Sequence, residues 1–223
     1  MNFQLKRDKS NVFWIRSMIS LSRKSKMFIL SLGLSLCALF LVWLSPSEKT
    51  LGSLVKLVYV HAALVYAALF TFMVAGVLGV TYIITSKQRI YLWLCAFQRT
   101  AFLFWGIYFL SSIILTYLAW GSIGWAEPRF QLAIHVLVMV SIVFLLSLWI
   151  DKPKIIAFLN AGLFLIIFYL TSTVQRIFHP SNPIGQSNSS AIKFYALTVL
   201  LIFFLISFLT AYLMFPSREE LKD

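Results

Sequence analysis

Residues 57–84 read LVYVHAALVYAALFTFMVAGVLGVTYII and contain no lysine, arginine, aspartate or glutamate. A helix needs about 20 mainly apolar residues to cross the roughly 30 Å of hydrocarbon in a bilayer. The stretch therefore predicts a membrane-spanning helix. Its length predicts that this helix either tilts or extends beyond the bilayer.

Five more runs of this kind fill most of the chain, which has 223 residues, 61% of them hydrophobic. They lie at about residues 27–44, 91–119, 130–150, 155–174 and 192–215. We therefore predict an all-α, polytopic membrane protein in which residues 27–215 form one domain of six transmembrane helices. A basic segment at residues 1–26 precedes this domain, and a short tail at residues 216–223 follows it.

The six predicted spans place the connecting segments alternately on the two sides of the membrane, and lysine and arginine residues are more frequent on one of these sides. Such residues near the ends of spans mark the cytoplasmic side. Thirteen lie before the first span, in the connections after the second and fourth spans, or after the sixth, whereas five lie in the other connections. We therefore expect both termini in the cytoplasm and the protein in the cell's inner (plasma) membrane. The formal net charge of +12 then reflects topology, and no nucleic-acid partner is expected.

The remaining basic residue, Arg99, lies inside the third run and allows two interpretations. Residues 100–119 are long enough to span by themselves, so the Arg99 side chain can snorkel to the inner interface. The alternative is a charge within the membrane, which usually has a functional role.

Three histidines lie toward the predicted external side. His61 is near the outer end of the second run, His135 is five residues into the fourth, and His179 is in the last external loop. Taken singly, each is typical of an interfacial residue that makes a hydrogen bond. We expect His135 to make such a bond within the bundle, because it lies about a turn and a half below the loop that precedes it.

An aromatic loop with the sequence WGSIGWAEPRF occupies residues 120–130 on the same side. Tryptophan is common at membrane boundaries, and an exposed acid–base pair contributes little by itself. Together with histidines from two external segments, however, the loop offers what haem needs. Imidazoles can be axial ligands, aromatic rings can cover the macrocycle, and a cation can pair with the propionates. The sequence therefore predicts a haem site at the outer face.

These residues resemble the tryptophan-rich (WWD) haem-handling family of cytochrome c maturation, most closely the CcmC type of six-span haem-exporter subunit. That family has a loop of the form WGxxWxWDxR between its third and fourth spans, flanked by one histidine at the outer start of the second span and one in the last external loop. Here the segments YVHAALVYAALF and FHPSNPIG supply the two histidines. The motif is degenerate in its middle, where bulky or aromatic residues of the family are replaced by Ile123, Gly124 and Ala126.

The resemblance implies a protein that holds haem transiently and presents it to a haem chaperone, which delivers it to apocytochrome c. The implied iron ligands are His61 and His179. The implied haem-binding residues of the loop are Trp120, Gly121, Trp125, Glu127 and Arg129.

Such a subunit is not itself an enzyme and works beside an ATP-binding-cassette ATPase and a second permease-like subunit. The chain accordingly contains no GxxxxGKS or GxxxxGKT motif for ATP. Two alternatives stay open. One is a cytochrome c synthase-type enzyme that joins haem to apocytochrome c. The other is a permease-like structural subunit whose haem site has decayed, which the degenerate motif favours.

Overall fold

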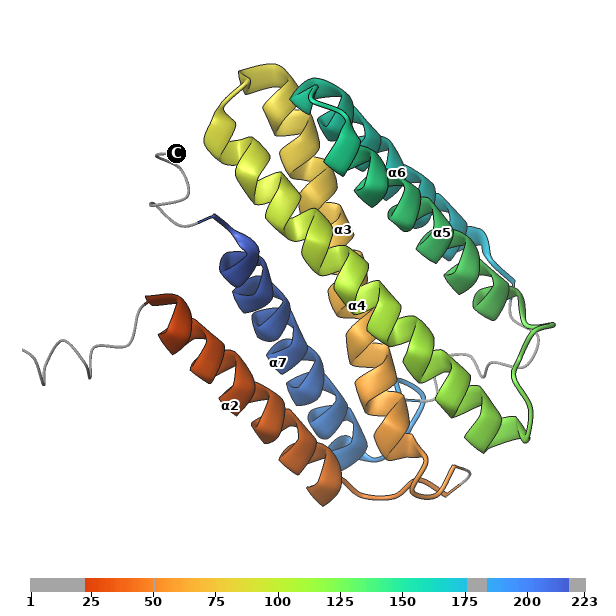
Figure 1. Ribbon diagram of the computed structural model, residues 1–223. Helices are drawn as coiled ribbons and strands as arrows, with labels where there is room; N and C mark the ends of the chain where they lie inside the picture. The colour runs from red at the N-terminus through yellow and green to blue at the C-terminus, as the bar shows by residue number, and fades with distance from the viewer. Residues whose placement is uncertain (1–22, 50, 176–183, 217–223) are drawn as a thin grey trace, which may run out of the picture.

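Six long helices form a single bundle in the computed structural model of the protein (Figure 1), which describes residues 23–49, 51–175 and 184–216. All six are long and apolar enough to cross a membrane, and no strand forms in these ranges. The prediction of an all-α chain with six spans is therefore confirmed. The helices are α2 (Arg23–Leu44), α3 (Val55–Thr85), α4 (Gln88–Trp120), α5 (Pro128–Trp149), α6 (Pro153–Thr173) and α7 (Ser190–Met214).

Local sequence signals explain several of the helix ends. Pro128 and Pro153 open α5 and α6, where the missing backbone N–H of proline costs nothing. Gly121 follows α4 with φ 72°, a left-handed conformation that glycine adopts without strain. At the start of α7, the Ser189 hydroxyl accepts a hydrogen bond from the backbone N–H of Ile192. These signals set helix lengths within a few residues of those predicted.

α3 is the centre of the bundle and packs against α4, α6 and α7. Its contact with α6 is close because Gly79 faces the α6 backbone. A Cβ atom built on Gly79 would lie 2.5 Å from the carbonyl oxygen of Ala157. Small residues of this kind allow transmembrane helices to approach one another.

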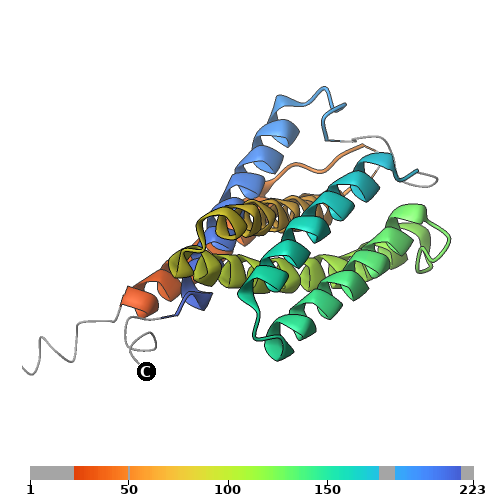
Figure 2. The same cartoon turned by 90° about the horizontal axis from the view of Figure 1, so that it is seen from above.

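α6 and α7 both pack on α3 but do not contact each other within the described residues. Figure 2 shows the two helices diverging on either side of α3. Because of this separation, one flank of α3 is left uncovered, and Tyr66 on that flank is 55% exposed. The bundle is therefore open along one side near this residue.

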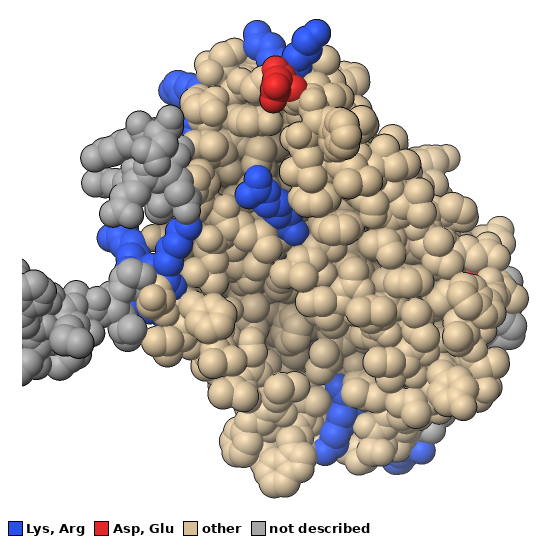
Figure 3. Space-filling view, in the orientation of Figure 1, with Lys and Arg blue, Asp and Glu red and all other residues tan. Residues whose placement is uncertain are grey.

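Charged side chains gather mostly at the ends of the bundle, and the face between them in Figure 3 is largely uncharged. The start of α2 and the end of α7 lie at the same end as the α3–α4 and α5–α6 connections (Figure 1). We call this the inner end, and the end with loop 121–127 the outer end, following the predicted topology.

Arg99 is exposed on α4 at the level where α7 ends. Near it, the Thr100 hydroxyl lies 3.6 Å from the Met214 sulfur, and the rings of Trp93 and Phe215 are 4.4 Å apart. Since Met214 is the last residue of α7, Arg99 lies close to the inner end of a neighbouring span. This position favours the snorkelling interpretation over a charge buried in the bundle.

Candidate functional site

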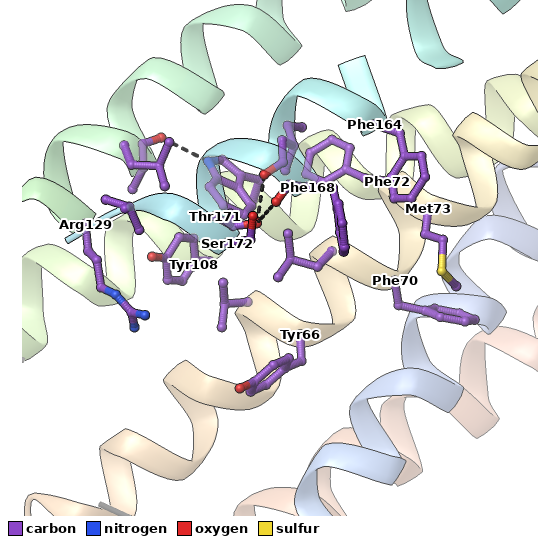
Figure 4. Close-up of a pocket in the computed structure, with 17 residues that line it drawn as sticks. Tyr66, Phe70, Phe72, Met73, Tyr108, Arg129, Phe164, Phe168, Thr171 and Ser172 are labelled. Atoms are coloured by element: carbon purple, nitrogen blue, oxygen red, sulfur yellow. Dashed lines mark hydrogen bonds between the residues drawn. The ribbon is translucent and has the colours of Figure 1, made fainter. Parts of the chain in front are cut away.

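A cavity of about 590 Å³ lies between α3, α4, α5 and α6 (Figure 4). Its walls are largely aromatic, and its volume is typical of pockets that bind small molecules or cofactors. The aromatic lining residues are Tyr66, Phe70, Phe72, Trp105, Tyr108, Phe164 and Phe168.

Trp105 fixes the deep wall of this cavity. Its side chain is 1% exposed, and its indole N–H donates a hydrogen bond to the backbone carbonyl of Ala133 over 3.0 Å. The ring also meets Phe72 edge-on, with 5.7 Å between centroids. This one residue therefore ties α4 to α5 and α3 where the three helices border the cavity.

Arg129 contributes a positive charge to the cavity wall. It lies in the first turn of α5, and Glu127, which precedes this helix, is fully buried. The Glu127 carbonyl accepts hydrogen bonds from the backbone N–H groups of Phe130 and Gln131, which anchors the start of the helix. Figure 4 shows Arg129 beside Tyr108 at one end of the cavity. An anionic group on a bound ligand would find a partner here.

His61 lies at the edge of the cavity, on the same face of α3 as the lining residue Val65 one turn further along. Its ring packs against Tyr108 with 5.0 Å between centroids, and its Nδ1 atom lies 3.0 Å from the Ser111 hydroxyl oxygen. His61 and Arg129, which are far apart in the sequence, therefore both lie near Tyr108: Arg129 lines the cavity, whereas His61 packs on the wall residue Tyr108 and is not itself a lining residue.

The two loop tryptophans do not line this cavity. Trp120 is 38% exposed and Trp125 is 59% exposed. The Trp125 ring meets Phe130 edge-on at 5.3 Å, and the Trp120 ring lies so close to Gly124 that a Cβ atom there would be 2.9 Å from it. Gly124 thus permits a loop conformation in which both indoles face outward at the outer end.

His135 is exposed on α5, and its ring makes no hydrogen bond within the described part of the chain. The expectation that it bonds within the bundle was wrong. The buried stripe of α5 consists of Ala133, Val136, Val140 and Val143, and the helical repeat turns residue 135 away from that stripe.

His179 lies outside the described residues, in the segment that joins α6 to α7. The described residues on either side of this segment border two cavities. Val174 lines the large cavity, and Ile184 lines a smaller one of about 220 Å³ between α3 and α7. Tyr66 borders both cavities, so the two lie side by side on α3.

Sequence reasoning did not identify Tyr108, Ser111 or Trp105 as site residues. Tyr108 and Trp105 lie in a long apolar run, where aromatic side chains are ordinary. The one available signal was the polar pair Ser111–Ser112 near the outer end of that run. This pair is important because Ser111 contacts His61, fifty residues earlier in the chain, and the sequence does not show that contact.

No known protein-family model matches the sequence, and a comparison with curated proteins gave no match either. The resemblance to the haem-handling family therefore remains a prediction that depends on the quoted residues.

Proposed function

We propose that this protein binds haem at the outer end of its bundle and hands it on during cytochrome c maturation, as a subunit of a haem exporter. In this proposal haem is a cargo that is held transiently. A haem chaperone receives it, and ATP hydrolysis is the task of a partner subunit of the ATP-binding-cassette type.

The observation that carries the proposal is an arginine in the wall of an aromatic-lined cavity and a histidine packed on the wall residue Tyr108. Haem is a wide apolar plate with two carboxylates on one edge and an iron that accepts imidazole. The cavity of about 590 Å³ supplies apolar walls, Arg129 supplies the cation, and His61 lies at the edge. The porphyrin itself occupies four positions on the iron, so one or two protein ligands suffice. A site of three or more clustered His, Cys, Asp or Glu residues, as for zinc, does not form in the described chain.

The chain's own residues have separate tasks in this scheme. His61 provides one imidazole, and His179 is proposed to provide the second from the α6–α7 segment. Arg129 orients the plate by its carboxylate edge. The exposed indoles of Trp120 and Trp125 then lie at the outer surface, where a partner that receives haem would contact them.

The proposal is tested by the absorbance of the purified protein after haem supplementation. We expect a Soret band that weakens and shifts in His61→Ala and in His179→Ala, because each variant loses an axial ligand. Added imidazole should partly restore the band by filling the vacant position. His135→Ala is the matched control and should leave the spectrum unchanged, since its ring faces away from the bundle core.

A wild-type protein that stays colourless would instead favour the structural subunit with a decayed site. A His135→Ala protein that loses haem, beside a His179→Ala protein that keeps it, would assign the second ligand to α5. The synthase alternative predicts more than binding, because the purified protein would then attach haem covalently to an apocytochrome c peptide containing CxxCH.

A further inference from the structure

The contact between His61 and Ser111 determines which nitrogen of the imidazole carries the proton. A neutral imidazole has one N–H group and one nitrogen with a lone pair, and the partner of one nitrogen fixes the role of the other. His61 Nδ1 is 3.0 Å from Ser111 Oγ. Either atom can be the donor across this distance, so a second contact must decide.

That second contact is made by the same hydroxyl group. Ser111 Oγ lies 2.7 Å from the backbone carbonyl oxygen of Tyr108, one turn earlier on α4. Two oxygen atoms at this separation need a proton between them, because their lone pairs otherwise repel. The carbonyl has no proton to give, so the single hydroxyl proton of Ser111 is the donor to Tyr108.

Ser111 Oγ therefore faces His61 with a lone pair and accepts a hydrogen bond from the Nδ1–H group. The opposite arrangement would satisfy the imidazole but leave the 2.7 Å oxygen–oxygen contact without a proton. The His61 ring also packs 5.0 Å from the Tyr108 ring at an interplanar angle of 45°. The Tyr108 carbonyl, the Ser111 hydroxyl and the Tyr108 ring thus all belong to one stretch of α4.

We propose that Ser111 is a positioning residue that holds neutral His61 as the Nδ1–H tautomer, which leaves the lone pair on Nε2. The part that concerns iron rests on the proposed function: Nε2 is then the ligating atom, and donation from Nδ1 makes it a stronger ligand. The tautomer itself follows from the two contacts of Ser111 and does not involve iron.

The tautomer is measured by ¹⁵N NMR of the haem-free protein in lipid bilayers, with histidine as the labelled residue. The chain has three histidines, so the His61 signals are assigned by their loss in His61→Gln. We expect a protonated Nδ1 and an unprotonated Nε2 at a pH where the ring is neutral. Ser111→Ala should move His61 toward the Nε2–H form that free histidine prefers.

Ser112→Ala is the matched control. Ser112 donates to the same Tyr108 carbonyl over 2.9 Å but has no bond to His61, so this variant should keep the wild-type tautomer. If Ser111→Ala does not fold, Ser111→Thr and Ser111→Val form a second pair of nearly equal shape, of which only Thr retains the hydroxyl. A wild-type His61 protonated at Nε2, or a tautomer unaffected by loss of the Ser111 hydroxyl, would overturn the proposal.

The consequence for iron is measured separately, by haem titration and by the reduction potential of the bound haem. Loss of an outer-shell partner typically weakens metal binding by about 10- to 100-fold, and we expect a loss of this order in Ser111→Ala, recovery in Ser111→Thr and no change in Ser112→Ala. A wild-type protein that does not bind haem would refute the proposed function but leave the tautomer result standing. Unchanged haem affinity and potential in Ser111→Ala would refute the role of Ser111 toward iron.

Discussion

At the scale of single residues, the outer cavity has the guanidinium of Arg129 in a mainly apolar and aromatic wall that also includes Thr171 and Ser172, and the His61 imidazole packs on the wall residue Tyr108. The two groups come from different helices, and Tyr108 lies between them. Trp105 holds the helices of this wall in register through its bond to Ala133. Under the proposed function, a ligand with one metal centre and one anionic edge would use both groups at once.

Arg129→Gln is expected to weaken haem binding by about 10- to 100-fold, because a hydrogen bond to a charged group contributes about 1.5–3 kcal/mol. The effect should disappear with a haem dimethyl ester, whose propionates are blocked. Titration of both compounds measures the difference. The control is Lys193→Gln, which removes a positive charge from α7 outside the large cavity. Equal losses for haem and its ester would show that Arg129 does not pair with the propionates.

At the scale of elements, the α4–α5 loop and the α3–α6 contact determine the shape of the site. The loop turns both indoles outward, and Gly124 makes room for the Trp120 ring. The α3–α6 contact depends on Gly79, which faces the Ala157 carbonyl, and on Gly76, which faces Phe164 and so lets α6 contribute Phe164 and Phe168 to the cavity wall. The loop and the α3–α6 contact therefore each depend on glycine at a position where a Cβ atom would meet a neighbouring group.

Trp120 and Trp125 lie in or beside the α4–α5 loop, whereas Trp43 and Trp149 lie at the ends of α2 and α5. Trp120→Ala and Trp125→Ala are expected to lower haem retention more than Trp43→Ala and Trp149→Ala, because the resemblance implies that the loop indoles cover haem where it extends beyond the cavity toward the outer surface. All four side chains are exposed, but Trp120 (38%) and Trp125 (59%) are less so than Trp43 (69%) and Trp149 (84%), so the melting temperature of each variant is compared as well. Retention is measured as absorbance that survives gel filtration. Equal losses from all four would identify the loop tryptophans as ordinary membrane-boundary residues.

Gly79→Ala is expected to lower stability by about 1–3 kcal/mol, the usual cost of overpacking. Its new methyl group would meet the Ala157 carbonyl, and backbone cannot move aside as a flexible side chain can. Gly106→Ala is the control, since a Cβ atom there has no neighbour within 4 Å. Thermal unfolding in detergent compares the two variants, and similar melting temperatures would contradict the close α3–α6 contact.

At the scale of the whole molecule, the cavity lies toward one end of the bundle and beside its open flank. α6 and α7 separate around α3 within the described chain, so Tyr66 is exposed where the large and small cavities adjoin. The start of α2 and the end of α7 are at the opposite end from loop 121–127. Whether the site lies toward the outside or the inside of the cell therefore depends on which end of the bundle faces the cytoplasm.

The charge bias predicts that orientation. A reporter that is active only outside the cytoplasm should be active when fused after Pro128 and silent when fused after Lys152, because thirteen basic residues mark the opposite side from loop 120–130. Enzyme activity normalised to the amount of fusion protein provides the measurement. The reverse pattern would place the cavity at the cytoplasmic face and remove the basis for delivery to an external chaperone.

Hydrophobic length and charge placement are properties of each segment alone, so the sequence was enough to predict the six spans, their approximate ends and the placement of histidine, tryptophan and arginine toward one predicted side. Which helix faces meet depends on the folded bundle. These helices are apolar nearly all round, so periodicity does not show which side packs inward. For this reason the outward turn of His135, the exposed indoles of the loop and the bond between His61 and Ser111 could not be read from the sequence. Each depends on contacts between residues that are distant along the chain or on the face of a helix that its neighbours leave uncovered.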